Sequence, residues 1–258
     1  MNFQNINPDK SVSLFVKSIW VFEENNEEQR TILPFFADGF PGLIYYEAVK
    51  GMTVFPQDKI MPPFFIYGQT ISPIEVVFEG SYKMIVFQLY PFILKRFFNI
   101  DPKTINDNCY DLQQLNDTEI SATSSQLPLS NTTERRIELI TAFLSSVFEA
   151  KRQTLDFKIK QALQLSMDNK GQLSIKDLCR KIKVNERTLE RRFTSETGVS
   201  PKQFAKIIQF QSSLEQLTVK DFNKLTDIVY QNGFVDQSHF IKVFKVFTGK
   251  TPKGFSKK

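Results

Sequence analysis

Residues 177–204 read DLCRKIKVNERTLERRFTSETGVSPKQF, and residues 227–255 read DIVYQNGFVDQSHFIKVFKVFTGKTPKGF. The second stretch repeats the first. Matching positions pair Asp177 with Asp227, Asn185 with Asp236, Leu189 with Phe240, Phe193 with Phe244, Gly198 with Gly249, Pro201 with Pro252, and Phe204 with Phe255. The leading aspartates lie 50 positions apart and every later pair 51, so the second copy has one extra residue before its cap. This spacing indicates a duplicated helix-turn-helix.

The first copy predicts two helices separated by a short turn. Residues 175–182 place their apolar side chains on one helical face, and Lys183-Val184 makes the turn. Asn185 is suited to cap the next helix, which we expect from Glu186 to Thr197. Gly198 then ends that helix, as a glycine in the left-handed conformation does.

The second copy repeats these signals. Gly233-Phe234 makes the turn, Asp236 caps, and Gly249 ends the helix. One helix from about Lys202 to Leu217 joins the two copies, with Pro201 at its first turn. The chain therefore contains two helix-turn-helix units on one linker.

The second helix of each copy has an apolar and a polar face. Leu189 and Phe193 point inward in the first copy, and Phe240, Phe244 and Phe247 in the second. The polar faces carry the residues that we predict to contact DNA: Arg187, Glu190, Arg191 and Thr194 in the first copy, and Gln237, Ser238, His239 and Lys242 in the second.

The block from about Leu155 to Phe255 resembles the DNA-binding domain of the AraC/XylS family of bacterial transcription regulators. The motifs that carry the resemblance are LERRF at 189–193, GVSP at 198–201, GFVDQSHFIKVF at 233–244 and GKTP at 249–252. The resemblance implies that the eight polar residues named above face the DNA groove. It also implies an N-terminal cupin-like barrel that senses a small molecule, dimerises, or does both. Activation and a contact with RNA polymerase are possible within the family, and the sequence leaves activation or repression open. The linker departs from the family where it reads IQFQ at 208–211, since the family usually has an arginine there.

Composition and charge agree with a DNA partner. The 258 residues are 41% hydrophobic and 24% charged, as expected for a soluble chain with two domains, and no apolar run approaches the roughly 18 residues of a membrane span. The first eight residues lack the features of a signal peptide, so we expect a cytoplasmic protein. From Lys170 onward 18 Lys and Arg face 8 Asp and Glu, whereas the rest has 15 against 20. The basic part contains the repeat, which favours double-stranded DNA as the partner and predicts salt-dependent binding.

The first 151 residues have a β-rich texture. Six apolar segments separated by turn residues predict strands in an antiparallel barrel or sandwich: residues 14–22, 42–46, 52–55, 64–67, 74–78 and 83–89. Residues 92–98 and 134–151 are predicted helices, and the Ser/Thr-rich segment 121–131 is a predicted loop. We expect an α+β chain with an N-terminal cupin-like barrel (1–151), a joint near Arg152 to Thr154, and an all-α DNA-binding domain (152–258).

The sequence offers little for catalysis. His239 is the only histidine, so histidine-based metal or catalytic sites are excluded from the barrel, and we expect no cofactor and no enzyme. Cys109 and Cys179 are expected to be reduced structural thiols. Glu23, Glu24, Glu27 and Glu28 form an acidic cluster that either attracts a cation or is solvated, the latter being favoured. Six phenylalanines between Phe35 and Phe65 either line an apolar pocket or fill the core, which we favour.

Two alternatives and an oligomeric prediction complete the interpretation. One alternative is a small-molecule-binding or enzymatic barrel with a basic tail, and the other is a non-specific architectural DNA binder. The apolar stripe of the helix from Glu134 to Lys151, which includes Phe143 and Val147, either packs on its own barrel or pairs with a second subunit. The second arrangement predicts a homodimer, and we expect Phe143→Asp then to give a folded monomer.

Overall fold

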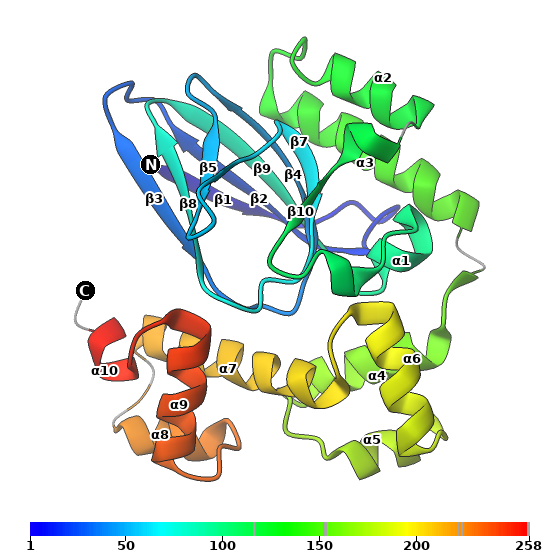
Figure 1. Cartoon of the computed structure of the whole chain (residues 1–258), viewed down its shortest axis with the longest axis vertical. Helices are drawn as coiled ribbons and strands as arrows, with labels where there is room; N and C mark the ends of the chain where they lie inside the picture. The colour runs from blue at the N-terminus through cyan, green and yellow to red at the C-terminus, as the bar shows by residue number, and fades with distance from the viewer. Residues whose placement is uncertain (116, 152–153, 221, 223, 257–258) are drawn as a thin grey trace.

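The computed structural model describes residues 1–258 except 116, 152–153, 221, 223 and 257–258. An N-terminal β-rich region lies above an all-helical C-terminal region (Figure 1). The predicted α+β class is therefore confirmed. Most of the predicted joint lies outside the described residues, since only Thr154 of the segment 152–154 is described.

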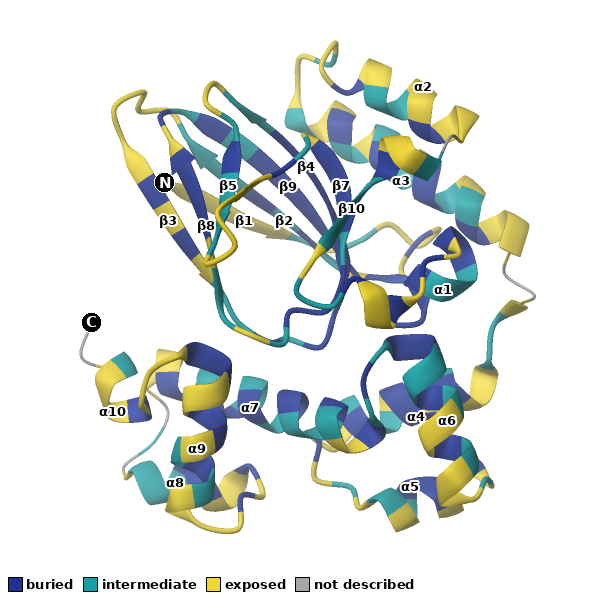
Figure 2. Cartoon of the chain, in the orientation of Figure 1, coloured by how far each residue is buried: buried dark blue, intermediate teal, exposed yellow. Residues whose placement is uncertain are grey.

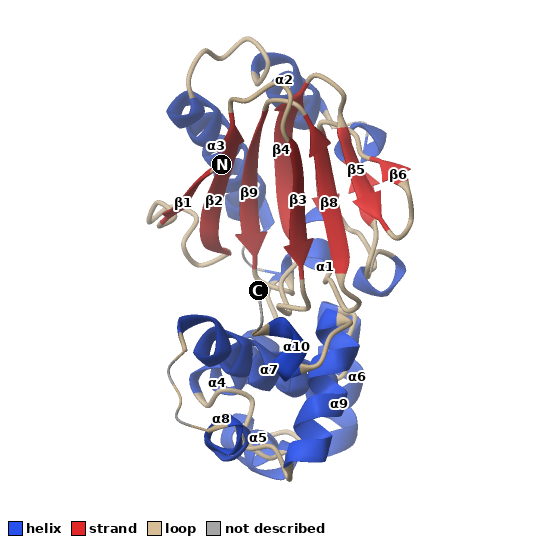
Figure 3. Cartoon of the chain, turned by 90° about the vertical axis from the view of Figure 1, so that its left-hand side faces the viewer, coloured by secondary structure: helices blue, strands red, loops and turns tan. Residues whose placement is uncertain are grey.

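The strands form two antiparallel sheets (Figure 3). One sheet has the order β1 (Asn2–Ile6), β2 (Val16–Glu24), β9 (Tyr82–Leu89), β4 (Gly42–Ala48), β7 (Phe64–Tyr67) and β10 (Cys109–Asp111). The other has the order β3 (Arg30–Phe35), β8 (Ile74–Glu79), β5 (Met52–Phe55) and β6 (Lys59–Ile60). Each ladder between described strands lies within one sheet, so the ladders do not show the predicted closure into a barrel.

All six predicted strands are present, and β1, β3, β6 and β10 were not predicted. In β3, Thr31 and Leu33 are buried while their neighbours are exposed, a period-2 pattern. Pro34 within this segment weakens the sequence signal for a strand. The structure accommodates Pro34 because β3 lies at the edge of its sheet, where a missing N–H breaks no second ladder.

The sheets have two apolar surfaces to cover. The inner faces pack against each other around Met52, Phe65, Phe78 and Met84, all buried. The outer face of the six-stranded sheet is covered by α1 (Ile93–Phe98) and α3 (Thr133–Lys151) (Figure 1). Two short 3₁₀ helices, η1 (Pro102–Thr104) and η2 (Leu112–Leu115), lie between them along the chain.

The prediction of a loop at 121–131 was wrong for residues 121–126, because α2 spans Thr118–Gln126, and it is confirmed for residues 127–131. Asp117 caps it by accepting hydrogen bonds from the N–H groups of Glu119 and Ile120. The hydroxyls of Ser121, Thr123 and Ser125 donate to carbonyls four residues earlier, so these side chains do not compete with the helix. Ile120 is its one buried residue, and the helix therefore has no apolar period that a sequence reading would detect.

The apolar stripe of α3 packs within its own chain. The Phe143 ring lies 6.3 Å from Phe98 and 6.4 Å from Phe64, and Phe148 lies 4.4 Å from Phe15, measured between centroids. Phe143 is only 4% exposed. Of the two alternatives for this stripe, the structure shows packing within the chain, so the stripe gives no support to a homodimer.

The C-terminal region consists of helices only. They are α4 (Phe157–Asp168), α5 (Ile175–Ile182), α6 (Glu186–Thr197), α7 (Pro201–Val219), α8 (Leu225–Gln231), α9 (Gln237–Thr248) and α10 (Pro252–Phe255). Asp156 caps α4 by accepting hydrogen bonds from the N–H groups of Lys158 and Ile159. Within the described part of the chain, no helix is both long enough and apolar enough to cross a bilayer.

Candidate DNA-binding site

The first helix-turn-helix is formed by α5, α6 and a tight turn. Lys183 leaves α5 in the left-handed conformation with φ 55°, and the Asn185 side chain accepts the N–H of Thr188 at 2.8 Å. Leu189 and Phe193 are fully buried. Gly198 ends α6 at φ +82°. The predicted cap, core and stop are all confirmed.

The second unit, α8 with α9, repeats this geometry. Asp236 accepts the N–H of His239 at 2.7 Å, and Gly249 ends α9 at φ +72°. Phe240 and Phe244 are fully buried, with their ring centroids 5.6 Å apart. The register of the sequence repeat is therefore also the register of the fold.

Most predicted contact residues lie on the open faces of α6 and α9 (Figure 2). Arg187, Glu190, Arg191, Gln237, Ser238 and Lys242 are exposed. Thr194 and His239 are half-buried. The structure thus brings four polar residues together on each helix, with six of the eight side chains open to a partner.

Arg191 and Arg192 have different environments although they are adjacent. Arg192 donates to the Asp156 carboxylate at the start of α4, from Nε at 2.8 Å, so it ties α6 to α4. Arg191 is exposed, and none of the ion pairs between described residues includes it. Arg191 therefore remains the stronger candidate for contacting a base.

His239 and Thr194 are less open than predicted. The His239 ring lies edge-on to Phe234 at 5.7 Å, and its Nδ1 is buried with no hydrogen-bond partner in the described structure. The hydroxyl of Thr194 is likewise buried without a partner. Both side chains lie at the margin of the exposed face, not at its centre.

The two units lie at opposite ends of α7 (Figure 1). A helix of 19 residues is about 28 Å long. Successive major-groove segments on one side of DNA lie about 34 Å apart. The linker thus has nearly the length needed for α6 and α9 to enter two successive segments.

Comparison with known proteins identifies this geometry. Residues 178–258 match the family description "Helix-turn-helix domain". An HTH-type transcriptional activator, RhaS of Yersinia pestis, is 34% identical over 67 residues, which cover 26% of this chain and 24% of RhaS. Residues 178–258 therefore form a helix-turn-helix domain similar to that of known transcription regulators.

Other comparisons extend beyond the helix-turn-helix region. An uncharacterized HTH-type transcriptional regulator of Staphylococcus aureus is 25% identical over 166 residues, 62% of this chain. The chain spans only 22% of that relative's length. Residues 4–111 match a domain of unknown function, DUF6597. The crystal structure of ToxT from Vibrio cholerae O395 aligns over 98% of this chain and 96% of its own, with 14% identity and a TM-score of 0.46.

The helix-turn-helix region contacts the N-terminal region through residues at the end of α6. Arg96 of α1 donates from Nε and Nη2 to the two carboxylate oxygens of Glu196, each at 2.5 Å. Glu196 is 4% exposed, and its carboxylate raises the pKa of Arg96. Lys95 donates to the hydroxyl of Ser195 beside this pair. The ion pair and the burial of Glu196 therefore hold the end of α6 against the N-terminal region.

Backbone carbonyls beyond the pair complete the attachment. Gln69 donates to the carbonyl of Thr197 at 2.7 Å, and Asn106 donates to that of Gly198 at 3.2 Å. Farther along the chain, Gln211 near the middle of α7 donates to the carbonyl of Ala37 at 2.5 Å. Gln211 lies in the segment where the sequence departs from its family, and here it contacts the N-terminal region.

The sequence reading did not single out the residues of this attachment. A signal was present in the repeat, because Glu196 occupies the position of Phe247 in the second copy. A charged residue at a core position of a duplicated helix indicates a different neighbour. That neighbour, Arg96, lies 100 positions away along the chain.

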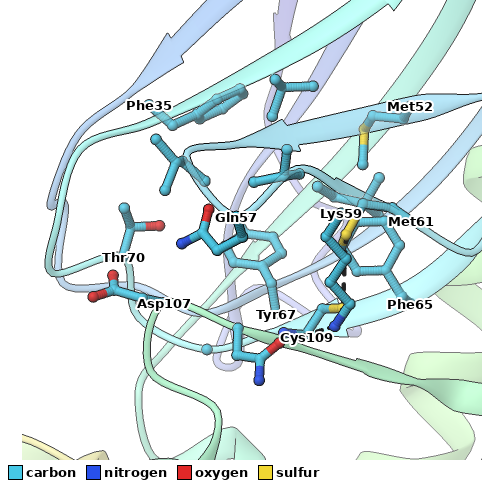
Figure 4. A pocket seen from close by; sticks show the side chains of 16 residues that line it. Phe35, Met52, Gln57, Lys59, Met61, Phe65, Tyr67, Thr70, Asp107 and Cys109 are labelled. Carbon is cyan, nitrogen blue, oxygen red and sulfur yellow. Dashed lines mark hydrogen bonds between the residues drawn. The ribbon is translucent and has the colours of Figure 1, made fainter.

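A cavity of about 70 Å³ lies between the two sheets (Figure 4). Phe35, Met61 and Phe65 line it, and Phe40 and Phe64 are buried elsewhere in the core. Pockets that hold small molecules usually measure roughly 300–1,000 Å³. Of the six phenylalanines, Phe40, Phe64 and Phe65 are buried and the other three are half-buried, so core filling is confirmed for half of them.

The two cysteines are free thiols. Cys179 is buried in the first helix-turn-helix, as predicted, and Cys109 is half-buried beside the cavity. The Sγ of Cys109 lies 3.4 Å from the Nζ of Lys59 and 3.8 Å from the Sδ of Met61. Burial raises the pKa of both thiols, which favours their protonated form at neutral pH.

Proposed function

We propose that the chain is a cytoplasmic, sequence-specific transcription regulator that reads double-stranded DNA with α6 and α9. The observation that carries this proposal is the pair of capped recognition helices, fixed at the two ends of the single helix α7. Their polar faces are exposed, while their apolar faces are buried in the core. The match to a helix-turn-helix domain and the similarity to the activator RhaS support the same function.

Base reading is assigned to the eight predicted contact residues. Arg187 and Arg191 have the guanidinium geometry that binds guanine in two places, and Glu190 accepts from the amino group of cytosine. Gln237, Ser238 and Lys242 present hydrogen-bonding groups from the first turns of α9. Thr194 and His239 contribute at the margins, in keeping with their partial burial.

The spacing of the helices defines the expected site. One monomer should cover two short boxes about 10 bp apart, one for each helix. Because α7 is somewhat shorter than a turn of DNA, we expect the site to bend toward the protein when both helices bind.

Selection of bound sequences from a random DNA pool with the whole chain tests the proposal. We expect a motif of two boxes, and we expect Arg191→Ala to lower affinity for it by about 1–3 kcal/mol while relaxing the preference at one position. Arg180→Ala, at an exposed arginine of α5 outside the predicted face, is the control. An enriched pool without a common motif would instead indicate an architectural binder.

The remaining roles follow from the family. We propose the division into a sensory domain of cupin-like type (1–151) and a DNA-binding domain (152–258), control by a small-molecule effector, and activation through RNA polymerase. A homodimer also belongs to this proposal, although it needs a surface other than the covered stripe of α3. Sedimentation at tens of micromolar with and without the selected DNA tests the dimer.

The comparisons favour a regulator over the enzymatic alternative. The match of residues 178–258 to a helix-turn-helix domain supports a regulator, and not a basic tail that only localises an enzyme.

A further inference from the structure

A groove of about 480 Å³ lies between the N-terminal sheets and the helix α7. Lys17, Trp20 and Asp38 line it from the N-terminal region, and Ile208 and Glu215 line it from α7. Its volume falls within the range of pockets that hold small molecules. The cavity between the sheets, at about 70 Å³, does not. A ligand in this groove would contact both regions of the chain.

Two carboxylates face the groove from opposite sides. Asp38 precedes β4 and accepts the N–H of Phe40 at 2.9 Å and the side-chain amide of Gln88 at 2.5 Å. Glu215 is exposed on α7. Among the ion pairs between described residues, none neutralises either carboxylate. The groove therefore offers negative charge on both of its walls.

Lys17 shows which group the groove accommodates. Its ammonium lies 3.8 Å from the centroid of the Phe40 ring, a cation–π contact. No ion pair within 4.0 Å joins this ammonium to a described carboxylate. Loss of water lowers the pKa of Lys17, while the charges of Asp38 and Glu215 oppose that shift. The primary amine of Lys17 thus already lies against the Phe40 ring, but it forms no ion pair with Asp38 or Glu215.

We propose that the groove binds a small organic amine with an apolar body. The ammonium of the ligand takes the position between Asp38 and Glu215, and the Lys17 side chain, which belongs to an exposed residue, moves into solvent. The apolar body lies against Trp20, Phe40 and Ile208. Aromatic faces and carboxylates are the two groups that recognise organic cations in proteins.

The ligand would act on the attachment of α7. Gln211 already joins α7 to the carbonyl of Ala37, next to Asp38. A cation shared by Asp38 and Glu215 adds a second link between the same two elements. Since α7 carries both recognition helices, the amine would favour the docked arrangement. This regulatory meaning rests on the proposed control of DNA binding by an effector, whereas binding itself does not.

Calorimetric titration of the whole chain with phenethylamine tests the site. Trp20 is the only tryptophan, so its fluorescence gives a second readout from the wall of the groove. We expect saturable binding, at least about tenfold weaker for 2-phenylethanol and for 3-phenylpropanoate, because each lacks the cation. Equal binding of the three compounds, tightest binding of the carboxylate, or no saturation up to about 10 mM amine would overturn the proposal.

Variants separate the groove from the rest of the surface. Glu215→Gln, at an exposed position, and Asp38→Asn should each weaken amine binding about tenfold, the loss of one charge-assisted contact. Lys17→Met should strengthen it, because the internal ammonium no longer competes. Glu28→Gln, at an exposed glutamate outside the groove, is the matched control and should change nothing. Unaltered affinity in both acid variants would refute the assignment.

Amine binding should also depend on pH. Burial raises the pKa of Asp38 to about 6, against the charge of Lys17. The other charged or titratable groups at this place are Glu215, Lys170 and Tyr67. Acidification through pH 6 protonates Asp38, so affinity should fall between pH 7.5 and pH 5. Since the titrations contain no DNA, their outcome is independent of the DNA selection experiment.

Discussion

The ion pair between Arg96 and Glu196 offers the sharpest test of how the two regions are joined. It closes with two hydrogen bonds of 2.5 Å, and its side chains are 30% and 5% exposed. We consider Arg96→Met, Glu196→Met and the double substitution. Methionine is similar in length to both side chains but carries no charge.

The size of the expected loss in unfolding free energy depends on the buried carboxylate of Glu196. Without Arg96, the remaining cation near Glu196 is Lys95, whose Nζ lies 4.0 Å away. Breaking a buried pair by removing one partner costs about 3–5 kcal/mol, and the 30% exposure of Arg96 reduces this to about 2–3 kcal/mol. The double variant should recover much of the loss, because no charge is then left buried. We therefore expect a coupling energy of about 1.5–2.5 kcal/mol.

Denaturant unfolding of the four proteins gives the coupling. Fluorescence of Trp20 reports on the N-terminal region, and helical circular dichroism reports mainly on the C-terminal region. The two transitions should coincide in the unmodified chain and separate in Arg96→Met. The exposed pair Asp177–Arg180 is the matched control, with an expected coupling of about 0–0.5 kcal/mol. A coupling at Arg96–Glu196 no larger than this would refute the reasoning.

Three further outcomes are expected. Gly198→Ala should destabilise the chain by more than Gly249→Ala. Both residues have positive φ, but only at Gly198 would the new Cβ meet backbone, 2.9 Å from the carbonyl of Pro102. Thermal unfolding of the two variants measures the difference. Acidification from pH 7.5 to pH 5 should raise the Tm of the unmodified chain relative to Asp38→Asn, because a carboxyl whose pKa is raised to about 6 contributes most when protonated; an unchanged difference would contradict this. Phe143→Asp should unfold the N-terminal region instead of giving a folded monomer, since it buries an unpaired charge; retention of native circular dichroism would show otherwise.

Local signals sufficed for the C-terminal fold. Each recognition helix depends on signals that lie close together in the sequence. In α6 these are the cap Asn185, the buried apolar residues and the terminal Gly198, and in α9 they are the cap Asp236, the buried apolar residues and the terminal Gly249. Capping bonds and helical periodicity depend only on such neighbours, so the repeat in the sequence reappears unchanged in the structure. The exposed faces of both recognition helices follow from the same periodicity.

Other features of the fold depend on contacts in the tertiary structure and not on neighbouring residues in the sequence. The pairing of ten strands into two sheets, the apolar partners of α3, and the helix α2 depend on contacts between distant segments. The links between the regions are more distant still, since Arg96 and Glu196 are 100 positions apart and Ala37 and Gln211 are 174. A side chain such as Glu196 shows its charge in the sequence but not its partner. The sequence by itself therefore determined which faces of α6 and α9 are exposed. Only the folded chain decided how those helices are held and where a groove opens between α7 and the N-terminal region.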